Sequence, residues 1–144
     1  MDIVMNILHV ACAVFIIGPM AVLPHLAPRL LRGRHGDAVV SLAATTNVFS
    51  WLSLLTFIFG FGAMGMTADK YGTSFGDTWI WLSIVLYIIA LLLNLLLVAP
   101  AMRRSGKAVI ADSGATVSAG PIAGGAGVAT LCLIVVVVLM VWKP

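Results

Sequence analysis

Four long apolar segments divide the chain and limit what it can fold into. They run over approximately residues 3–28, 42–66, 78–102 and 117–142. A helix needs about 20 apolar residues to cross the ~30 Å hydrocarbon core of a bilayer, so each segment is long enough to span a membrane. Backbone groups in lipid must pair within their own segment, which favours helices over strands. We therefore expect a single all-α transmembrane domain over residues 1–144.

The composition agrees with a chain whose surface faces lipid. Of its 144 residues, 62% are hydrophobic and only 9% are charged. A soluble domain of this size needs a more charged surface to stay dispersed. The formal net charge of +3 does not indicate nucleic acid binding, because the cytoplasmic loops of membrane proteins also carry excess lysine and arginine. The partners we expect are the lipid bilayer and other integral membrane subunits, or further copies of the chain, but no nucleic acid.

Short connections join the segments, so consecutive helices should be antiparallel neighbours in an integral membrane up-and-down four-helix bundle. Six of the eight lysines and arginines fall in the first and third connections, namely Arg29, Arg32, Arg34, Arg103, Arg104 and Lys107. Because cation-rich loops stay in the cytoplasm, we expect a multi-pass protein of the bacterial plasma membrane with both termini outside. Binding of anionic lipid head groups is an alternative role for these arginines.

Small residues recur at helical spacing in two of the segments. The second segment ends with Gly60, Gly62 and Gly65, and the fourth begins with Gly120, Gly124 and Gly127. Such faces let helix backbones approach closely in lipid. We expect them to pack inside the bundle, with docking of another subunit as the alternative. On this interpretation Gly124→Leu pushes helices apart, whereas Val136→Leu is nearly silent.

A histidine, His9, lies in the outer half of the first apolar segment. An unpaired polar group there is costly, so it indicates either a functional site or a partner on another helix. The second segment offers hydroxyl and amide partners such as Asn47 and Thr56. The alternative is that the imidazole is an axial ligand of haem b. We expect the hydrogen-bonding role, because Cys12 is the only other potential ligand nearby on its face.

The remaining histidines and the catalytic motifs give little indication of an enzyme. We expect His25 and His35 to be solvated near the cytoplasmic connection. The four apolar segments contain no Asp, Glu, Lys or Arg, whereas ion-coupled transporters usually place such groups near the middle of the membrane. The chain also has no HExxH zinc motif and no phosphate-binding loop. We therefore expect no metal and no resident cofactor.

Short motifs at both ends of the chain resemble a known family. The first helix contains ILHV and, further on, Gly18; RGRHGDAVV follows this helix, and the chain closes with LMVWKP. With these motifs the whole chain resembles a family of small bacterial predicted integral membrane proteins that have four helices and no assigned function. The resemblance implies a four-helix membrane protein.

A more distant similarity is to the haem-dependent four-helix protoporphyrinogen IX oxidase. That family also has a histidine in the first helix, which corresponds to His9, and a Gly…Leu-Pro stretch, which corresponds to Gly18, Leu23 and Pro24. Where that family continues with arginine this chain has His25, and it lacks a lysine inside the third helix. The similarity implies haem binding at His9 more than it implies catalysis.

We therefore predict a non-catalytic accessory or assembly subunit of a larger membrane complex. A respiratory, electron-transferring supercomplex is the host that we consider first. The alternative is a haem b-binding membrane protein, active in porphyrin or electron-transfer chemistry, with His9 as the axial ligand.

Overall fold

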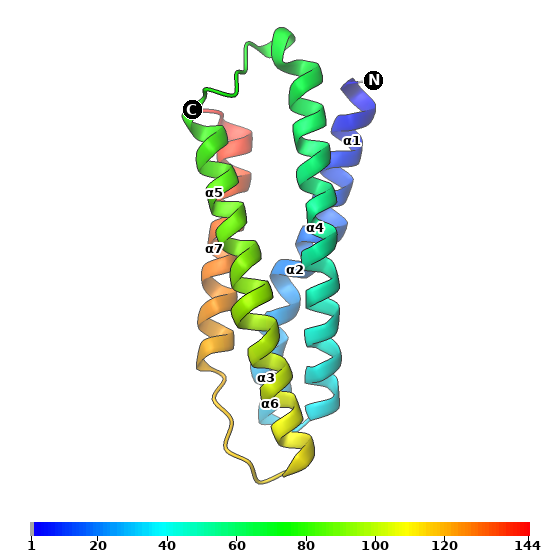
Figure 1. Cartoon of the computed structure of the whole chain (residues 1–144), viewed down its shortest axis with the longest axis vertical. Helices are drawn as coiled ribbons and strands as arrows, with labels where there is room; N and C mark the ends of the chain where they lie inside the picture. The colour runs from blue at the N-terminus through cyan, green and yellow to red at the C-terminus, as the bar shows by residue number, and fades with distance from the viewer. Residues whose placement is uncertain (1) are drawn as a thin grey trace.

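The computed structural model describes the backbone of residues 2–144 and their side chains except those of Asp2 and Tyr71. This part of the chain is helical, without strands, and contains four helices long and apolar enough to cross a membrane: Ile3–Arg32, Gly36–Lys70, Thr78–Ala111 and Gly120–Trp142. They run up and down in turn, and both termini lie at the end where the second and third spans are joined (Figure 1). The expected all-α four-helix membrane architecture is confirmed.

The first span is broken into short pieces. It comprises α1 (Asp2–Cys12), a π-helical turn (Ala13–Ile17), α2 (Gly18–Val22), a 3-10 turn (Leu23–Leu26) and α3 (Ala27–Arg32). Pro19, Pro24 and Pro28 explain these breaks, because each removes a backbone donor and crowds the preceding turn. The span changes direction near α2 (Figure 1). Its two halves can therefore pack against different helices.

The second and third spans are longer than the sequence predicts, whereas the fourth begins three residues later than expected. The second is one unbroken helix, α4 (Gly36–Tyr71), of 36 residues, which at ~1.5 Å per residue is about 54 Å long and exceeds the hydrocarbon thickness. The third consists of α5 (Thr78–Leu92), a π-helical turn (Leu93–Val98) and α6 (Ala99–Ala111), and the fourth is α7 (Gly120–Trp142). Hydropathy locates the part of a helix in lipid but not its continuation beyond the membrane.

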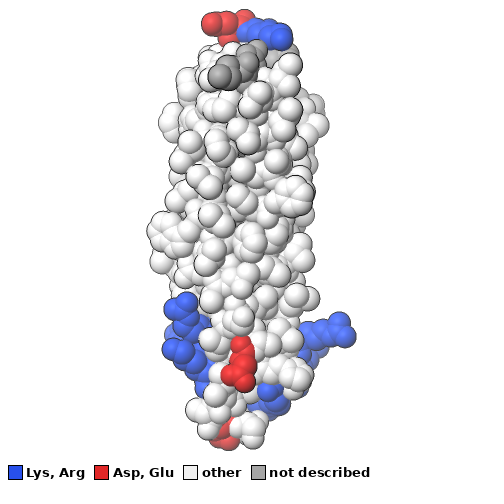
Figure 2. Space-filling model, turned by 90° about the vertical axis from the view of Figure 1, so that its right-hand side faces the viewer, with Lys and Arg blue, Asp and Glu red and all other residues white. Residues whose placement is uncertain are grey.

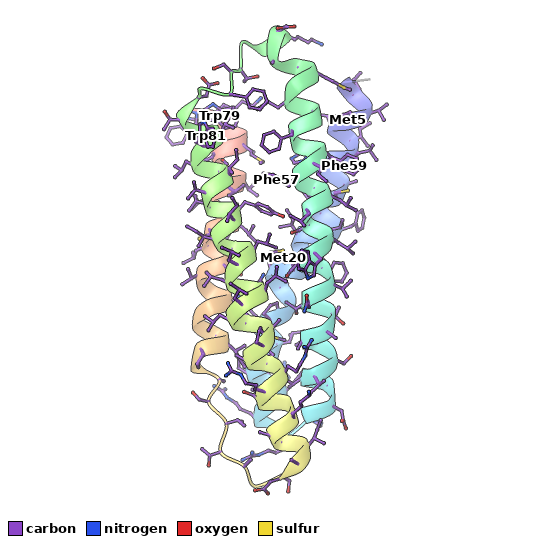
Figure 3. The ribbon with its side chains drawn as sticks, viewed as in Figure 1. Met5, Met20, Phe57, Phe59, Trp79 and Trp81 are labelled. Atoms are coloured by element: carbon purple, nitrogen blue, oxygen red, sulfur yellow. The ribbon has the colours of Figure 1, made fainter. Side chains whose placement is uncertain are left out.

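The helices pack as pairs. These pairs meet most closely at the end formed by the first and third connections, which carry most of the arginines and which we call the basic end. The main contacts join α1 to α4, α4 to α6, and α5 to α7. At the end that carries the termini the α1–α4 pair stands apart from the α5–α7 pair (Figure 1). Aromatic rings bridge the two pairs there: Phe57 of α4 stacks on Tyr87 of α5 with ring centroids 5.2 Å apart. Figure 3 shows Phe57 between the two pairs and Met20 below it.

A stripe of small polar side chains lies along the inner face of α4. Thr46, Ser50, Ser53 and Thr56 are buried. Ser50 donates to the carbonyl of Thr46 at 2.8 Å, and Ser53 donates to the carbonyl of Ser50 at 2.6 Å. Ser53 Oγ also lies 2.7 Å from the hydroxyl of Tyr87, which must then be the donor. The stripe thereby connects α4 to α5 by a polar bond within the membrane.

Two close helix contacts depend on glycines that the sequence did not single out. A Cβ at Gly36, at the start of α4, would lie 2.6 Å from the carbonyl oxygen of Gly106 on α6. A Cβ at Gly125 on α7 would lie 2.8 Å from Cγ2 of Val98. In both places only glycine lets the helices come this close.

The glycines predicted in the fourth span face the other way. Gly124 and Gly127 would present a Cβ to open space, and Gly120 would meet only Ser118 of the preceding connection. Internal packing was therefore the wrong expectation for these three residues, because the inner face of α7 is rotated by about half a turn from them. Val136 was also wrongly expected to be a neutral position, since it is only 7% exposed and lies in the core.

We predict that Gly125→Leu lowers the free energy of unfolding, because an extra side chain in a well-packed contact typically costs about 1–3 kcal/mol. Gly124→Leu is the matched control, since the same change one position along meets nothing within 4 Å. Thermal unfolding of both variants in mild detergent measures the difference. Equal stability of the two variants would contradict the rotation of α7 described here.

Candidate functional site

The imidazole of His9 connects the first span to the second. Its Nδ1 lies 2.9 Å from the carbonyl oxygen of Thr56, across the contact between α1 and α4. A carbonyl oxygen only accepts hydrogen bonds, so Nδ1 carries the proton and donates it. In the neutral ring Nε2 is then unprotonated and presents a lone pair. The structure thus shows the interhelical hydrogen bond expected from the sequence, and it also fixes the ring nitrogen that stays available for a ligand.

Gly60 provides the room for this ring. It follows Thr56 by four residues and so lies on the same face of α4. A Cβ at Gly60 would be 2.9 Å from Cε1 and 3.1 Å from Nδ1 of His9. Any side chain at this position would push the ring away from the Thr56 carbonyl. Gly60 therefore leaves the space that the His9 ring occupies.

The other two predicted glycines of α4 differ from each other. A Cβ at Gly62 would collide with the terminal methyl group of Met5, so Gly62 also accommodates α1. Figure 3 places Met5 on α1 beside α4. A Cβ at Gly65 would meet nothing within 4 Å. The α1–α4 contact thus depends on Gly60 and not on Gly65, whereas the flexible side chain of Met5 can make room for a Cβ at Gly62.

His25 is exposed, as the sequence led us to expect. Its hydrogen bond was not expected: Nε2 lies 2.9 Å from Oγ1 of Thr130 on α7. Thr130 itself donates to the carbonyl of Ala21 at 3.2 Å, so it accepts from Nε2–H of His25. The 3-10 turn around Pro24 reorients this part of the first span and brings His25 to α7. His35 is exposed in the first connection, as expected.

The first span is therefore tied to two different helices by two histidines. His9 binds α4 in the half that carries the N-terminus, and His25 binds α7 in the half nearer the basic end. The sequence contained a signal for the second tie, because His25 directly follows Pro24, and a proline disrupts the helix around it. The partner on α7 could not be identified from the sequence, since Thr130 is 105 residues away.

Asn94 is the most deeply buried amide group in the site region. It lies in the π-helical turn of the third span, is 1% exposed, and has its Nδ2 at 3.5 Å from the carbonyl of Met20. Within the described residues, its Oδ1 and the hydroxyls of Thr46 and Thr56 have no hydrogen-bond partner. Asn94 therefore pairs with the first span near α2 and does not assist His9.

The cysteines do not join the histidines in a ligand cluster. Cys12 and Cys132 are free thiols and both are partly buried. In the part of the chain that the structure describes, no three His, Cys, Asp or Glu side chains come together in a way that could hold a metal ion. His9 Nε2 would thus be a single protein ligand to a metal at this site.

The comparison with protein families gives one match. A family model described as "Predicted integral membrane protein (DUF2269)" matches residues 3–144. It confirms the family resemblance that rests on ILHV and LMVWKP. No curated protein and no solved structure matches the chain.

We predict that Gly60→Ala is less stable than Gly65→Ala. Glycine to alanine inside a helix normally stabilises by about 0.5–1 kcal/mol, and Gly65→Ala should show this gain. At Gly60 the new methyl group displaces His9 and weakens an interhelical hydrogen bond, which is worth about 0.6 kcal/mol on average and ~1.7 kcal/mol at most. Thermal unfolding in mild detergent measures the difference in stability. An equal gain in stability for both variants would show that Gly60 does not make room for the His9 ring.

Proposed function

The chain belongs to the DUF2269 family of predicted integral membrane proteins, and we propose, from a surface of its own bundle, that it is a non-catalytic accessory or assembly subunit of a larger membrane complex. The observation that carries this proposal is the outer face of α7, which we define as Gly120, Ala123, Gly124 and Gly127. The first three residues are exposed and Gly127 is partly exposed. The bundle itself leaves this face uncovered.

The chemistry of the outer face favours another helix over lipid. Lipid tails are as apolar as leucine, so helices in a bilayer associate through close packing of small residues. The chain uses Gly125 for its own internal contact with Val98, so the outer face is a second small-residue surface on the same helix. A partner helix can approach the backbone of α7 there, whereas lipid gains little from a surface without side chains. Large apolar residues such as Leu131, which is 64% exposed, continue the face toward the membrane centre.

We further propose the bacterial plasma membrane as the location, with the basic end in the cytoplasm and both termini outside. Six of the eight cations lie at the basic end, against Lys70 and Lys143 at the other, and cation-rich ends stay inside. The host we propose is a respiratory, electron-transferring complex. A subunit that holds a ligand-capable imidazole inside its bundle suits a host that contains haem. Reporter fusions after Gly106 and after Pro144 test the orientation.

We predict that Gly124→Leu keeps the fold but loses the partner. The chain is tagged, expressed in its native membrane and purified in mild detergent, and the copurifying subunits are identified by mass spectrometry. Gly65→Leu is the matched control, because it makes the same change at another glycine where a Cβ meets nothing within 4 Å. We expect the wild type and Gly65→Leu to bring down the same respiratory subunits and Gly124→Leu to lose them. Identical recovery with all three proteins would contradict the docking role of the outer face.

Haem b binding is a second candidate function, and the His9–Thr56 hydrogen bond favours it. A histidine that ligates a metal usually donates its other ring N–H to a carbonyl or carboxylate, which fixes the tautomer and the ring orientation. Nδ1 of His9 makes this type of bond, so Nε2 fits an axial ligand of haem iron. Lys70 and Lys143 are the lysines at the same end of the bundle and would be the cations nearest to the propionates. When bound, the haem would supply one-electron chemistry.

Optical spectra distinguish the two candidate functions. The protein is expressed with a haem precursor in the medium, purified in mild detergent, and measured as a reduced-minus-oxidised difference spectrum. The haem candidate predicts a Soret band that His9→Gln abolishes and that the control variant His25→Gln retains. A colourless wild-type protein, or a band that survives His9→Gln, would exclude haem ligation by His9 and leave the accessory role.

A further inference from the structure

A shallow groove of about 330 Å³ lies at the basic end of the bundle, between α6, the connection that follows it, and the start of α7. We call it the basic groove. Its wall from α6 includes Ala101, Arg104 and Ser105, the connection contributes Thr116 and Ser118, and α7 contributes Pro121. It combines one guanidinium, three hydroxyls and apolar surface. Such a mixture suits an amphipathic molecule with an oxyanion.

The connection that forms one wall is held in place by the protein. Arg34, in the first connection, donates from its guanidinium to the carbonyl of Ala115 at 2.6 Å. Asp112 Oδ1 accepts the N–H of Gly114 at 2.9 Å, and its carbonyl accepts the N–H of Ala115 at 3.0 Å. Arg34 has a φ of 59°, a left-handed conformation that is unfavourable for a residue with a side chain. Contacts between the two connections therefore maintain the shape of the basic groove.

The charge around the basic groove is positive. Figure 2 shows the charged side chains at the two ends of the molecule, with lysines and arginines concentrated at the lower end and an uncharged body between them. The acidic residues at this end are Asp37 and Asp112, and Asp112 already accepts a hydrogen bond within its own turn. Arg104 is exposed. An anion is therefore attracted to this end and not to the middle of the bundle.

The depth of the basic groove matches the level of lipid phosphates. Met102 is fully buried, and the basic residues begin immediately after it with Arg103 and Arg104. The hydrocarbon of the bilayer ends where such a step from apolar to charged residues occurs, and the head groups lie just beyond. The basic groove thus opens at the boundary between tails and head groups.

A second groove lies further along the third span. It measures about 310 Å³ and is lined by Ile89, Leu92, Leu93, Leu96 and Leu97. Leu97 precedes Ala101 of the basic groove by four residues, which is about 6 Å along a helix. Leu93 is eleven positions from Arg104, which is about 16 Å along a helix at ~1.5 Å per residue. One acyl chain covers about half of the ~30 Å hydrocarbon core, so the leucine-lined groove has the right position and length for a lipid tail.

We propose that the two grooves together bind one anionic phospholipid of the leaflet at the basic end. The phosphate lies in the basic groove, where the guanidinium of Arg104 neutralises it and the hydroxyls of Ser105, Thr116 and Ser118 donate to its oxygens. One acyl chain lies along Leu97 and Leu93. The guanidinium makes charge-assisted hydrogen bonds to the phosphate, and the apolar groove adds selectivity for a molecule with a tail.

The test is native mass spectrometry of the purified protein, titrated in mild detergent with phosphatidylglycerol or with phosphatidylcholine of the same acyl chains. The wild type should retain phosphatidylglycerol more tightly. Arg104→Gln should weaken this binding about fivefold, which corresponds to the ~1 kcal/mol net contribution of one hydrogen bond to the phosphate. Arg103→Gln is the matched control, because it removes the same charge from the neighbouring position, which does not line the basic groove. It should change the binding less than twofold.

One further variant and one competitor complete the test. Ala108→Phe fills the basic groove and retains every charge, so it should also weaken phosphatidylglycerol binding. Inorganic phosphate at the same concentration should displace none of the lipid, because it lacks the tail. Equal losses in Arg104→Gln and Arg103→Gln, or full binding by Ala108→Phe, would mean that charge alone attracts the lipid and would overturn the proposal. Displacement by inorganic phosphate would overturn it too.

Discussion

Lipid gives transmembrane helices no hydrophobic reason to associate, so this bundle depends on places where backbones come close or polar groups pair. Three glycines provide the close approaches: Gly36 against Gly106, Gly60 against His9, and Gly125 against Val98. Each is located at a different contact between spans. The long apolar side chains on the outside, in contrast, contact lipid equally well in the folded and the separated helices and contribute little to association.

The first span illustrates how polar pairing complements these contacts. Prolines divide it into pieces, and a broken helix in lipid needs partners that take up the freed backbone groups. Asn94 and Thr130 donate to the carbonyls of Met20 and Ala21 in the first span. Two histidines of the span make bonds to other helices, His9 to the Thr56 carbonyl and His25 to the Thr130 hydroxyl. The same irregularity that would weaken an isolated helix thereby lets the span contact α4 with one half and α7 with the other. A histidine held in this way is also oriented for a ligand, and the two candidate functions of His9 share one geometry.

Much of the architecture was predictable from the sequence, because hydropathy over 20 residues reports how often the chain crosses lipid, and short connections set the antiparallel order. The rotation of a helix was not predictable. Gly124 and Gly125 are adjacent in sequence, and when a helix is apolar all around, no periodicity tells which of them faces inward. The Gly36–Gly106 contact joins residues far apart in the chain and lies beyond the apolar segments. The bond of His25 to Thr130 was not predictable either, because it depends on the turn at Pro24, whose geometry the sequence does not specify.

The central claim is that the imidazole of His9 donates a hydrogen bond from Nδ1 to the Thr56 carbonyl. Solid-state NMR of protein labelled with ¹⁵N-histidine in lipid bilayers measures the protonation of each ring nitrogen directly, and His9→Gln identifies the signals of this residue. The account predicts a proton on Nδ1 of His9, and loss of that signal pattern when Gly60→Ala displaces the ring. A His9 ring that carries its proton on Nε2 alone would contradict it.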